Sequence, residues 1–214
     1  FADVLRAHAD TFSLLHKFDD EGRLFVFIGN HDTFNAHHYQ SVKDGLPTIH
    51  SLLLTHQPTG QRLLLLHGHQ ADFAGSRFYP ISRLLSRSVL RWLRWPDREI
   101  FGAGDDPGSI VDTDPWKSRR RFDPQGKRIE QRLVEWIDEN HIPIICGHTH
   151  LPAFPAPNST PYFNLGSCGM PGFLTALELQ DGALSMVKWT LDPNGGAARQ
   201  SITPALPLAQ IVLP

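Results

Sequence analysis

Residues 142–150 read Ile-Pro-Ile-Ile-Cys-Gly-His-Thr-His, a short apolar run that ends in a glycine and two histidines. An apolar run of this length is typical of a strand buried on both faces of a sheet. The same arrangement occurs twice earlier in the chain: Leu24–Ile28 precedes Gly-Asn-His-Asp at 29–32, and Arg62–Leu66 precedes His-Gly-His at 67–69. In α/β sheets, ligands bind beyond the carboxyl ends of strands, so these motifs predict one shared site.

The segments around these motifs predict an α/β domain, a layered sandwich of mixed β-sheets flanked by helices. Apolar spacing predicts amphipathic helices over 4–18 and around Ile129–Ile137. Further strands are expected at 51–55, 174–179 and 184–189, the last two joined by a hairpin turn at Asp181-Gly182. The domain is expected to span 1–191, with a helical cap insertion at about 73–128 and a loose Pro/Gly-rich tail at 192–214.

The composition limits the functional classes. The chain has 214 residues and is 41% hydrophobic, enough for one sizeable core. Its net charge of −2 argues against a nucleic-acid coat protein. No apolar run approaches the roughly 20 residues that a membrane span needs. The two cysteines make no disulfide framework and fit a reducing compartment, so we expect a cytoplasmic protein.

The spacing of the histidines predicts a metal site. His148 and His150 are two residues apart, so in an extended segment both side chains point the same way and can reach one metal pair. Asn30 offers a carbonyl oxygen, an adequate ligand for a hard or borderline divalent ion. His67 directly follows its strand, which favours it over His69 as a ligand, although the sequence leaves this choice open.

Together, Gly-Asn-His-Asp at 29–32, the strand-end His67 and Gly-His-Thr-His at 147–150 resemble motifs of the calcineurin-like metallophosphoesterases. The resemblance runs from about residue 24 to 189. It includes Asn-Leu-Gly-Ser at 164–167, which is similar to a turn that often follows Gly-His-Thr-His in that family. The resemblance implies a sandwich fold and a two-metal centre that hydrolyses phosphoric esters.

The resemblance also implies roles for the matching residues. The implied ligands of two divalent ions (Mn, Fe, Zn, Co or Ni) are Asn30, His67, His148 and His150. The first three would hold one ion and the last would hold the other. A metal-activated hydroxide would attack a phosphomonoester, phosphodiester or pyrophosphate, while His31 protonates or stabilises the leaving oxygen and Asp32 holds its ring. His69 and Asp72 are candidates for contacts with the substrate or with the ligands.

The chain departs from the family pattern ahead of Asn30. The Asp-x-His and Gly-Asp-x-x-Asp motifs, which supply carboxylate ligands in the family, do not occur there. Four neutral ligands would leave two divalent ions to repel strongly. Because the chain opens with Phe1, we expect an N-terminal truncation that leaves this fragment inactive. The alternative is a non-catalytic binding or scaffold module that keeps the fold.

The expected insertion is basic. Residues 77–132 hold 13 basic and 8 acidic side chains, a local charge of +5. On a helix expected over 81–95, several arginines share one side, among them Arg83, Arg87 and Arg91. This pattern predicts either a packed lid or a cap that grips an anionic substrate: a phosphorylated small molecule, a lipid or a nucleotide. A pyrophosphatase that contacts a membrane surface through this cap is a further alternative.

Overall fold

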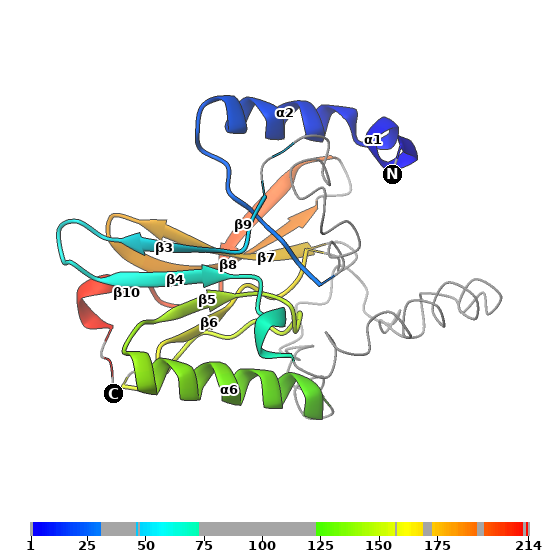
Figure 1. Cartoon of the computed structure of the whole chain (residues 1–214). Coiled ribbons are helices and arrows are strands. Elements are labelled where there is room, and N and C mark those ends of the chain that lie inside the picture. The colour runs from blue at the N-terminus through cyan, green and yellow to red at the C-terminus, as the bar shows by residue number, and fades with distance from the viewer. Residues whose placement is uncertain are drawn as a thin grey trace, which may run out of the picture. The chain divides into compact units, whose positions relative to one another are not determined.

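The computed structural model describes residues 2–30, 46, 48–72, 123–156, 158–168, 173–191, 195–211 and 213 (Figure 1). The chain divides into two compact units, Phe1–Leu52 and Leu53–Pro214. No helix in the described ranges is long and apolar enough to cross a membrane. The helix predicted over 81–95 lies outside these ranges.

The first unit begins with two helices. α1 spans Ala2–Ala7 and α2 spans Ala9–Asp20, with His8 between them. The sequence predicted one amphipathic helix over 4–18, and the structure is helical there but interrupted at His8. No residue of α2 is buried, so this helix contributes no side chain to a buried core.

A two-stranded parallel sheet follows, in which β1 (Val26–Phe27) pairs with β2 (Thr48–Ile49). The prediction of a strand over 24–28 buried on both faces is wrong. Both residues of β1 are only half-buried, and Phe25 is 54% exposed. An apolar run does not fix burial by itself, because burial depends on which elements cover each face of the strand.

The second unit is built on a four-stranded sheet. Its strands are, in order across the sheet, β3 (Ser51–Thr55), β4 (Arg62–Leu66), β5 (Ile144–Cys146) and β6 (Tyr162–Asn164). β4, β5 and β6 run parallel, whereas β3 runs antiparallel to β4 (Figure 1). The predicted bounds of β3 and β4 are confirmed. β5 occupies the last three residues of the strand predicted over 142–146.

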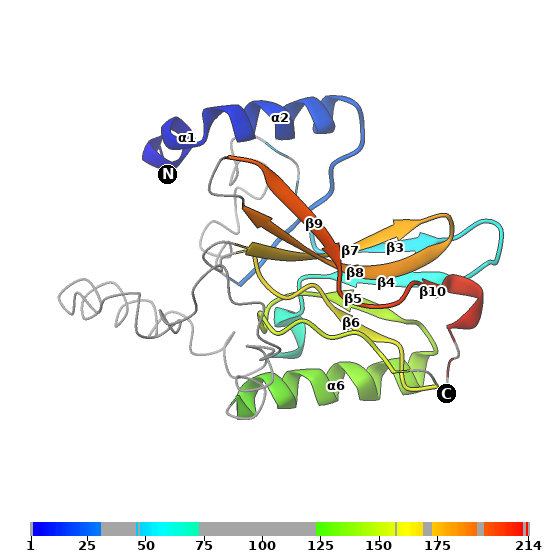
Figure 2. The same cartoon turned by 180° about the vertical axis from the view of Figure 1, so that it is seen from behind.

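This sheet has a core on each face, because alternate side chains of a strand point to opposite sides. On one face, Leu64 and Leu66 pack among residues that include the buried side of α6 (Pro124–Asn140). On the other face, Leu63 and Leu65 pack toward a second sheet. The two-sided burial explains why these strands are apolar at successive positions. Figure 2 shows the same layers from behind.

The second sheet is antiparallel. Its strands are β7 (Phe173–Gln180), β8 (Ala183–Leu191), β9 (Ala197–Ser201) and β10 (Leu206–Pro207). β7 and β8 form the predicted hairpin, and Asp181 and Gly182 adopt positive φ angles of 51° and 73° at its turn. Parallel and antiparallel pairing in one unit, with a helix against one face, confirms the predicted mixed α/β class.

The prediction of a loose tail over 192–214 is wrong. β9 and β10 both pair with β8, and Leu208, in the 3-10 helix η4 (Leu208–Gln210), is fully buried in the core between the sheets. The structure differs because β8 extends to residue 191 and offers hydrogen-bonding groups along its whole length. Pairing with an existing strand can impose strand structure on a segment with little strand propensity of its own.

Candidate functional site

Three histidine rings gather where β4 and β5 end. The centroid of the His67 ring lies 5.2 Å from the centroids of both His69 and His148, and those of His69 and His148 are 6.4 Å apart. β4 and β5 are neighbouring parallel strands, so the residues that follow them emerge at the same edge of the sheet. The sequence predicted that these strand ends share one site, and the structure brings these three histidines together.

Close backbone approach brings the two strand ends together. The amide of Gly147 donates a hydrogen bond to the carbonyl of His67 at 3.0 Å. Gly68 has a φ of 106°, and a Cβ at that position would lie 3.2 Å from the Cβ of His148. Glycine tolerates both this backbone angle and this proximity. The glycine of the His-Gly-His motif thus lets one histidine loop pack on the other.

Asp72 adds a buried carboxylate to this cluster. Its exposed fraction is 5%, and its Oδ2 atom lies 3.4 Å from Nε2 of His148. The same oxygen accepts a hydrogen bond from Nε2 of Gln125 at 3.0 Å. The sequence singled out Asp72 as a candidate for contact with substrate or ligands, but it gave no signal for Gln125. That residue lies in the first turn of α6, far away along the chain.

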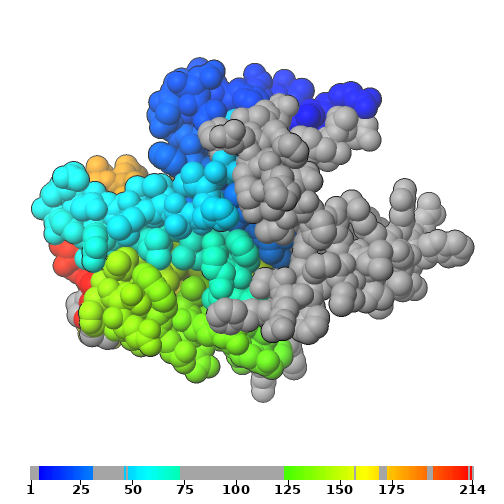
Figure 3. All heavy atoms as spheres, viewed as in Figure 1, coloured from blue at the N-terminus to red at the C-terminus, as the bar shows by residue number. Residues whose placement is uncertain are grey.

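Helix α6 also holds the short segment that carries His69. The 3-10 helix η2 spans His69–Ala71, and Arg132 donates a hydrogen bond from Nη1 to the carbonyl of Ala71 at 2.8 Å. Gln125 and Arg132 are seven residues apart, two helical turns, and so lie on the same side of α6. In the space-filling view, the green surface of α6 lies directly below the cyan β3–β4 hairpin on one face of this unit (Figure 3).

The rings of His67 and His69 contact each other through nitrogen. Their Nδ1 atoms are 3.3 Å apart. If both rings are neutral, one Nδ1 carries the hydrogen and the other accepts it, so the two side chains take different tautomers. A shared metal ion is the other arrangement that brings two imidazole nitrogens this close.

Asn164 anchors the loop after β5. This fully buried side chain donates from Nδ2 to the carbonyl of Gly147 at 2.7 Å and to Oγ1 of Thr149 at 3.0 Å. Its Oδ1 accepts a hydrogen bond from the amide of Gly166 at 3.0 Å. The sequence pointed to this turn only through the family resemblance and assigned Asn164 no role.

The loop is not extended as the sequence analysis expected. His148 and His150 both have left-handed backbone angles, with φ of 69° and 59°. The side-chain alternation of a strand does not apply to such residues, so the argument that both point the same way is wrong. His148 joins the cluster with 11% of its side chain exposed, whereas His150 is exposed.

Cys146 and Tyr162 lie beneath the loop without a chemical role. Burial raises the pKa of the Cys146 thiol to about 12 and raises the pKa of the Tyr162 hydroxyl. Because a thiol reacts as the thiolate, Cys146 is not a nucleophile at neutral pH. Its Sγ atom lies 3.6 Å from the Tyr162 hydroxyl, and both side chains are part of the core against α6.

The remaining predicted site residues are Asn30 and five residues outside the described ranges. Asn30 follows β1 in the first unit, after the buried Ile28 and Gly29. Five predicted residues lie outside the described ranges: His31, Asp32, Arg83, Arg87 and Arg91. The structure therefore brings together His67, His69, Asp72 and His148.

The donor atoms of this cluster suit a borderline divalent ion, since imidazole and carboxylate are common zinc ligands. Two ligand atoms of a tetrahedral zinc ion, each about 2.1 Å from the metal, lie about 3.4 Å apart. The two close atom pairs of the cluster have separations of 3.3 and 3.4 Å. Within the described ranges, however, no three His, Cys, Asp or Glu side chains are arranged to hold an ion together. The cluster thus has donor atoms of the right chemistry for a metal, but its described side chains do not form a complete metal site.

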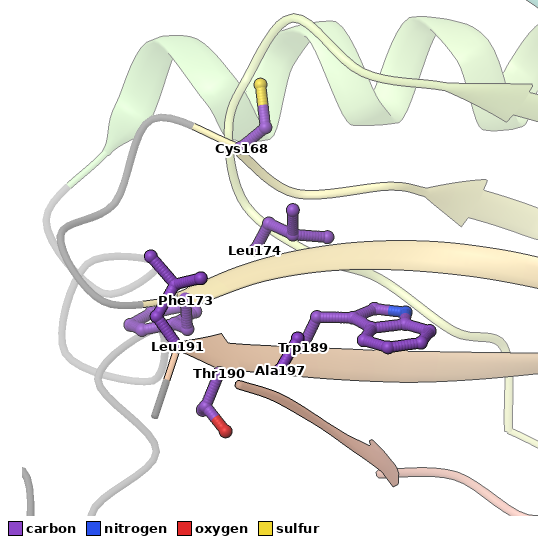
Figure 4. A pocket seen from close by; sticks show the side chains of 7 residues that line it. All are labelled: Cys168, Phe173, Leu174, Trp189, Thr190, Leu191 and Ala197. Atoms are coloured by element: carbon purple, nitrogen blue, oxygen red, sulfur yellow. The ribbon is translucent and has the colours of Figure 1, made fainter. Parts of the chain in front are cut away.

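An apolar cavity of about 350 Å³ lies at the ends of strands β7, β8 and β9 (Figure 4). Its lining consists of Cys168, Phe173, Leu174, Trp189, Thr190, Leu191 and Ala197. None of these side chains is a carboxylate or an imidazole. The described part of the lining therefore offers no acid–base pair, and the candidate site remains the histidine cluster.

Comparison with known proteins gives a weak likeness of fold. No family model and no curated protein matches the chain. A crystal structure of a double mutant of Vps29 from Entamoeba histolytica is similar over 75% of this chain and 63% of that chain, with 16% sequence identity and a TM-score of 0.27. The chain thus spans less than two thirds of that protein. A likeness at this level assigns no family and no function.

Proposed function

We propose that the protein is a metal-dependent phosphoesterase, which hydrolyses a phosphomonoester, phosphodiester or pyrophosphate bond. The observation that carries the proposal is the gathering of His67, His69 and His148 with the buried carboxylate of Asp72 at one edge of a parallel sheet. Imidazoles and a carboxylate at the carboxyl ends of neighbouring strands are suited to a divalent metal ion.

In this proposal, His67 and His148 would hold one divalent ion and His150 would bind the other. Bound divalent ions would supply Lewis-acid stabilisation of the phosphoryl oxygens and lower the pKa of water. His31 would give a proton to the leaving oxygen, with Asp32 orienting its ring.

Asp72 would reduce the charge repulsion expected when divalent ions are held by neutral ligands alone. A carboxylate beside His148 offsets part of the positive charge that bound ions bring, and burial makes this attraction stronger than it would be in water. One carboxylate does not balance two divalent ions, so the proposal still requires further acidic ligands for the second ion.

The substrate class follows from the charge of the predicted cap. Arg83, Arg87 and Arg91 would bind the phosphate groups or other anionic parts of a small molecule, lipid or nucleotide. Guanidinium groups pair well with phosphate oxygens because they donate two parallel hydrogen bonds.

The experiment is a hydrolysis assay of the purified protein, loaded in turn with Mn²⁺, Co²⁺ and Zn²⁺. The probes are p-nitrophenyl phosphate and bis(p-nitrophenyl) phosphate. We expect turnover of at least one probe that His148→Ala and His67→Ala abolish. His56→Ala is the matched control, because His56 precedes the β3–β4 turn and hydrogen-bonds with Thr59. Metal binding without hydrolysis of either probe would overturn the proposal in favour of a non-catalytic binding module.

A further inference from the structure

We propose that the outer edge of strand β3 is an interface at which two copies of this chain pair antiparallel, centred on Leu53. In this arrangement the four-stranded sheet of one copy continues into the sheet of the other. The inference does not depend on the proposed phosphoesterase activity, because no residue of β3 belongs to the histidine cluster.

The two ends of the four-stranded sheet differ in how they are covered. At one end, β6 is fully buried, and its Asn164 exchanges two backbone hydrogen bonds with Ala153, of 3.0 and 2.9 Å. At the other end lies β3, and within the described ranges no strand pairs with its outer edge (Figure 1). The sheet is therefore closed at β6 and open at β3.

The side chains of β3 do not protect this edge. The strand reads Ser-Leu-Leu-Leu-Thr and lacks the charged residues and prolines that usually prevent edge pairing. Leu53 is 48% exposed and Leu54 is 37% exposed. Because successive side chains of a strand point to opposite faces, β3 exposes a leucine on each face of the sheet. A helix lying on one face would cover only one of them, whereas an added strand brings side chains to both faces.

The hairpin fixes which backbone groups of β3 face outward. The amide of His56, directly after β3, donates to the carbonyl of Gln61 across the hairpin at 2.8 Å. In an antiparallel strand, the N–H and C=O groups of successive residues point alternately to the two sides. The even-numbered residues of β3 therefore face β4, as His56 does. The residues whose groups face the outer edge are Ser51, Leu53 and Thr55.

The sequence of β3 favours a second copy of itself as the partner, because it is symmetric about Leu53. In the proposed pairing, Leu53 lies opposite its own counterpart, Leu52 opposite Leu54, and Ser51 opposite Thr55. Leucine then meets leucine and hydroxyl meets hydroxyl, as a two-fold interface requires. All three outward-facing residues of each copy fall in hydrogen-bonded pairs, which gives about six backbone hydrogen bonds. Centring the pair on either neighbouring leucine would carry one outward-facing residue past the end of the facing strand.

The association state of the purified protein is the first test. Because one strand pair buries less area than a standard protein–protein interface, we expect a dimer with a dissociation constant in about the micromolar range. Gel filtration with light scattering, at loading concentrations from about 1 to about 200 μM, measures it. Leu53→Lys places lysine opposite lysine and should weaken dimerisation by at least about 10-fold. The matched control is Leu191→Lys, at a leucine of β8 that is 73% exposed, and it should dimerise like the wild type.

Cysteine substitutions test the register. Leu52 of one copy faces Leu54 of the other, with β-carbons about 4.5–5.5 Å apart, whereas two copies of the same position lie about 7–8 Å apart. The Leu52→Cys and Leu54→Cys proteins are each made with Cys168→Ser, because Cys168 is exposed. With diamide as the oxidant, we expect a disulfide-linked dimer when the two proteins are mixed and none when each is oxidised alone.

Dimerisation that is lost in Leu53→Lys and kept in Leu191→Lys, with cross-linking confined to the mixture, supports the interface. A wild-type protein that is monomeric over the whole range overturns it in favour of another occupant of the edge. A dimer that survives Leu53→Lys, cross-linking by either cysteine variant alone, or none in the mixture also overturns it. The cross-linking test does not use Leu53→Lys, so it decides the question even where that variant fails to fold.

Discussion

The Nε2 atom of His148 lies 3.4 Å from the Oδ2 atom of Asp72, a residue 76 positions earlier in the chain. This contact joins the loop after β5 to the segment that follows η2, next to helix α6. It places a buried carboxylate against one of three clustered imidazoles. The contacts around His148 can therefore be tested one at a time.

Asn164 should stabilise the loop that carries His148. Asn164→Ala removes hydrogen bonds to the carbonyl of Gly147 and to the amide of Gly166, and it leaves both groups poorly paired. We expect a loss of about 2–3 kcal/mol in the free energy of unfolding, measured by urea denaturation. Asn140→Ala, at the exposed end of α6, serves as the control, and an equal loss in both variants would argue against the anchoring role.

Gly68 should be sensitive to substitution for two separable reasons. Gly68→Ala places a Cβ close to His148 and puts alanine at a φ of 106°, whereas Gly60→Ala puts alanine at a φ of 68° with nothing within 4 Å. We expect the backbone strain to cost about 1 kcal/mol in each. Gly68→Ala should be less stable than Gly60→Ala and should also bind metal more weakly; equal behaviour of the two variants contradicts the close packing of the loops.

Cys146 should resist alkylation in the folded protein. Burial raises the pKa of its thiol to about 12, whereas Cys168 is exposed. Mass spectrometry after iodoacetamide treatment at about pH 8 should find Cys168 modified and Cys146 unmodified, and both modified after denaturation. Rapid labelling of Cys146 in the native state would be inconsistent with the packing described.

The raised pKa of Cys146 makes the free energy of unfolding depend on pH in the alkaline range. Burial raises the folded-state pKa of Cys146 above its ordinary value of 9.0, so the folded state keeps a proton that the unfolded state releases. This contribution is fully present below about pH 9 and is lost as the pH rises toward 12. Cys146→Ala should show a smaller fall in unfolding free energy over that interval, and a fall identical to that of the wild type would exclude this cause.

Substitution of Leu208 tests whether the C-terminal segment is packed against the core. Its side chain is fully buried in the core between the sheets, so Leu208→Ala should cost about 2–5 kcal/mol in unfolding free energy. Leu191 is 73% exposed, and Leu191→Ala should change stability little. A Leu208→Ala protein as stable as the Leu191→Ala control would restore the expectation of a loose tail.

His31 should act on turnover without holding metal. In the metal-loaded protein, His31→Ala should reduce kcat by about 100- to 10,000-fold, the range typical of a lost general acid. Metal content, measured by inductively coupled plasma mass spectrometry, should stay near that of the wild type. Parallel loss of metal and turnover would make His31 a ligand instead.

The sequence predicted the strands best where both faces are buried. The bounds of β4 are confirmed because Leu63 to Leu66 supply side chains alternately to two cores, which requires an unbroken apolar run. β9 could not be predicted this way. All its residues are exposed, and its structure comes from pairing with β8.

The site was predicted in part for a comparable reason. Strand ends carry local signals, so the positions of His67 and His148 could be inferred from short motifs. The contact between Asp72 and His148 depends on how η2 packs against α6, and no local pattern encodes it. The left-handed angle of His148 could not be predicted either, because it occurs in a loop held by hydrogen bonds from Asn164, a residue on another strand.

Equilibrium dialysis of the purified protein against Co²⁺ measures whether the imidazole cluster binds a divalent ion. We predict bound cobalt in the wild-type protein and in His56→Ala, with affinity reduced by at least about 10-fold in His67→Ala and in His148→Ala. Equal cobalt affinity in all four proteins, or none in the wild type, would contradict the account.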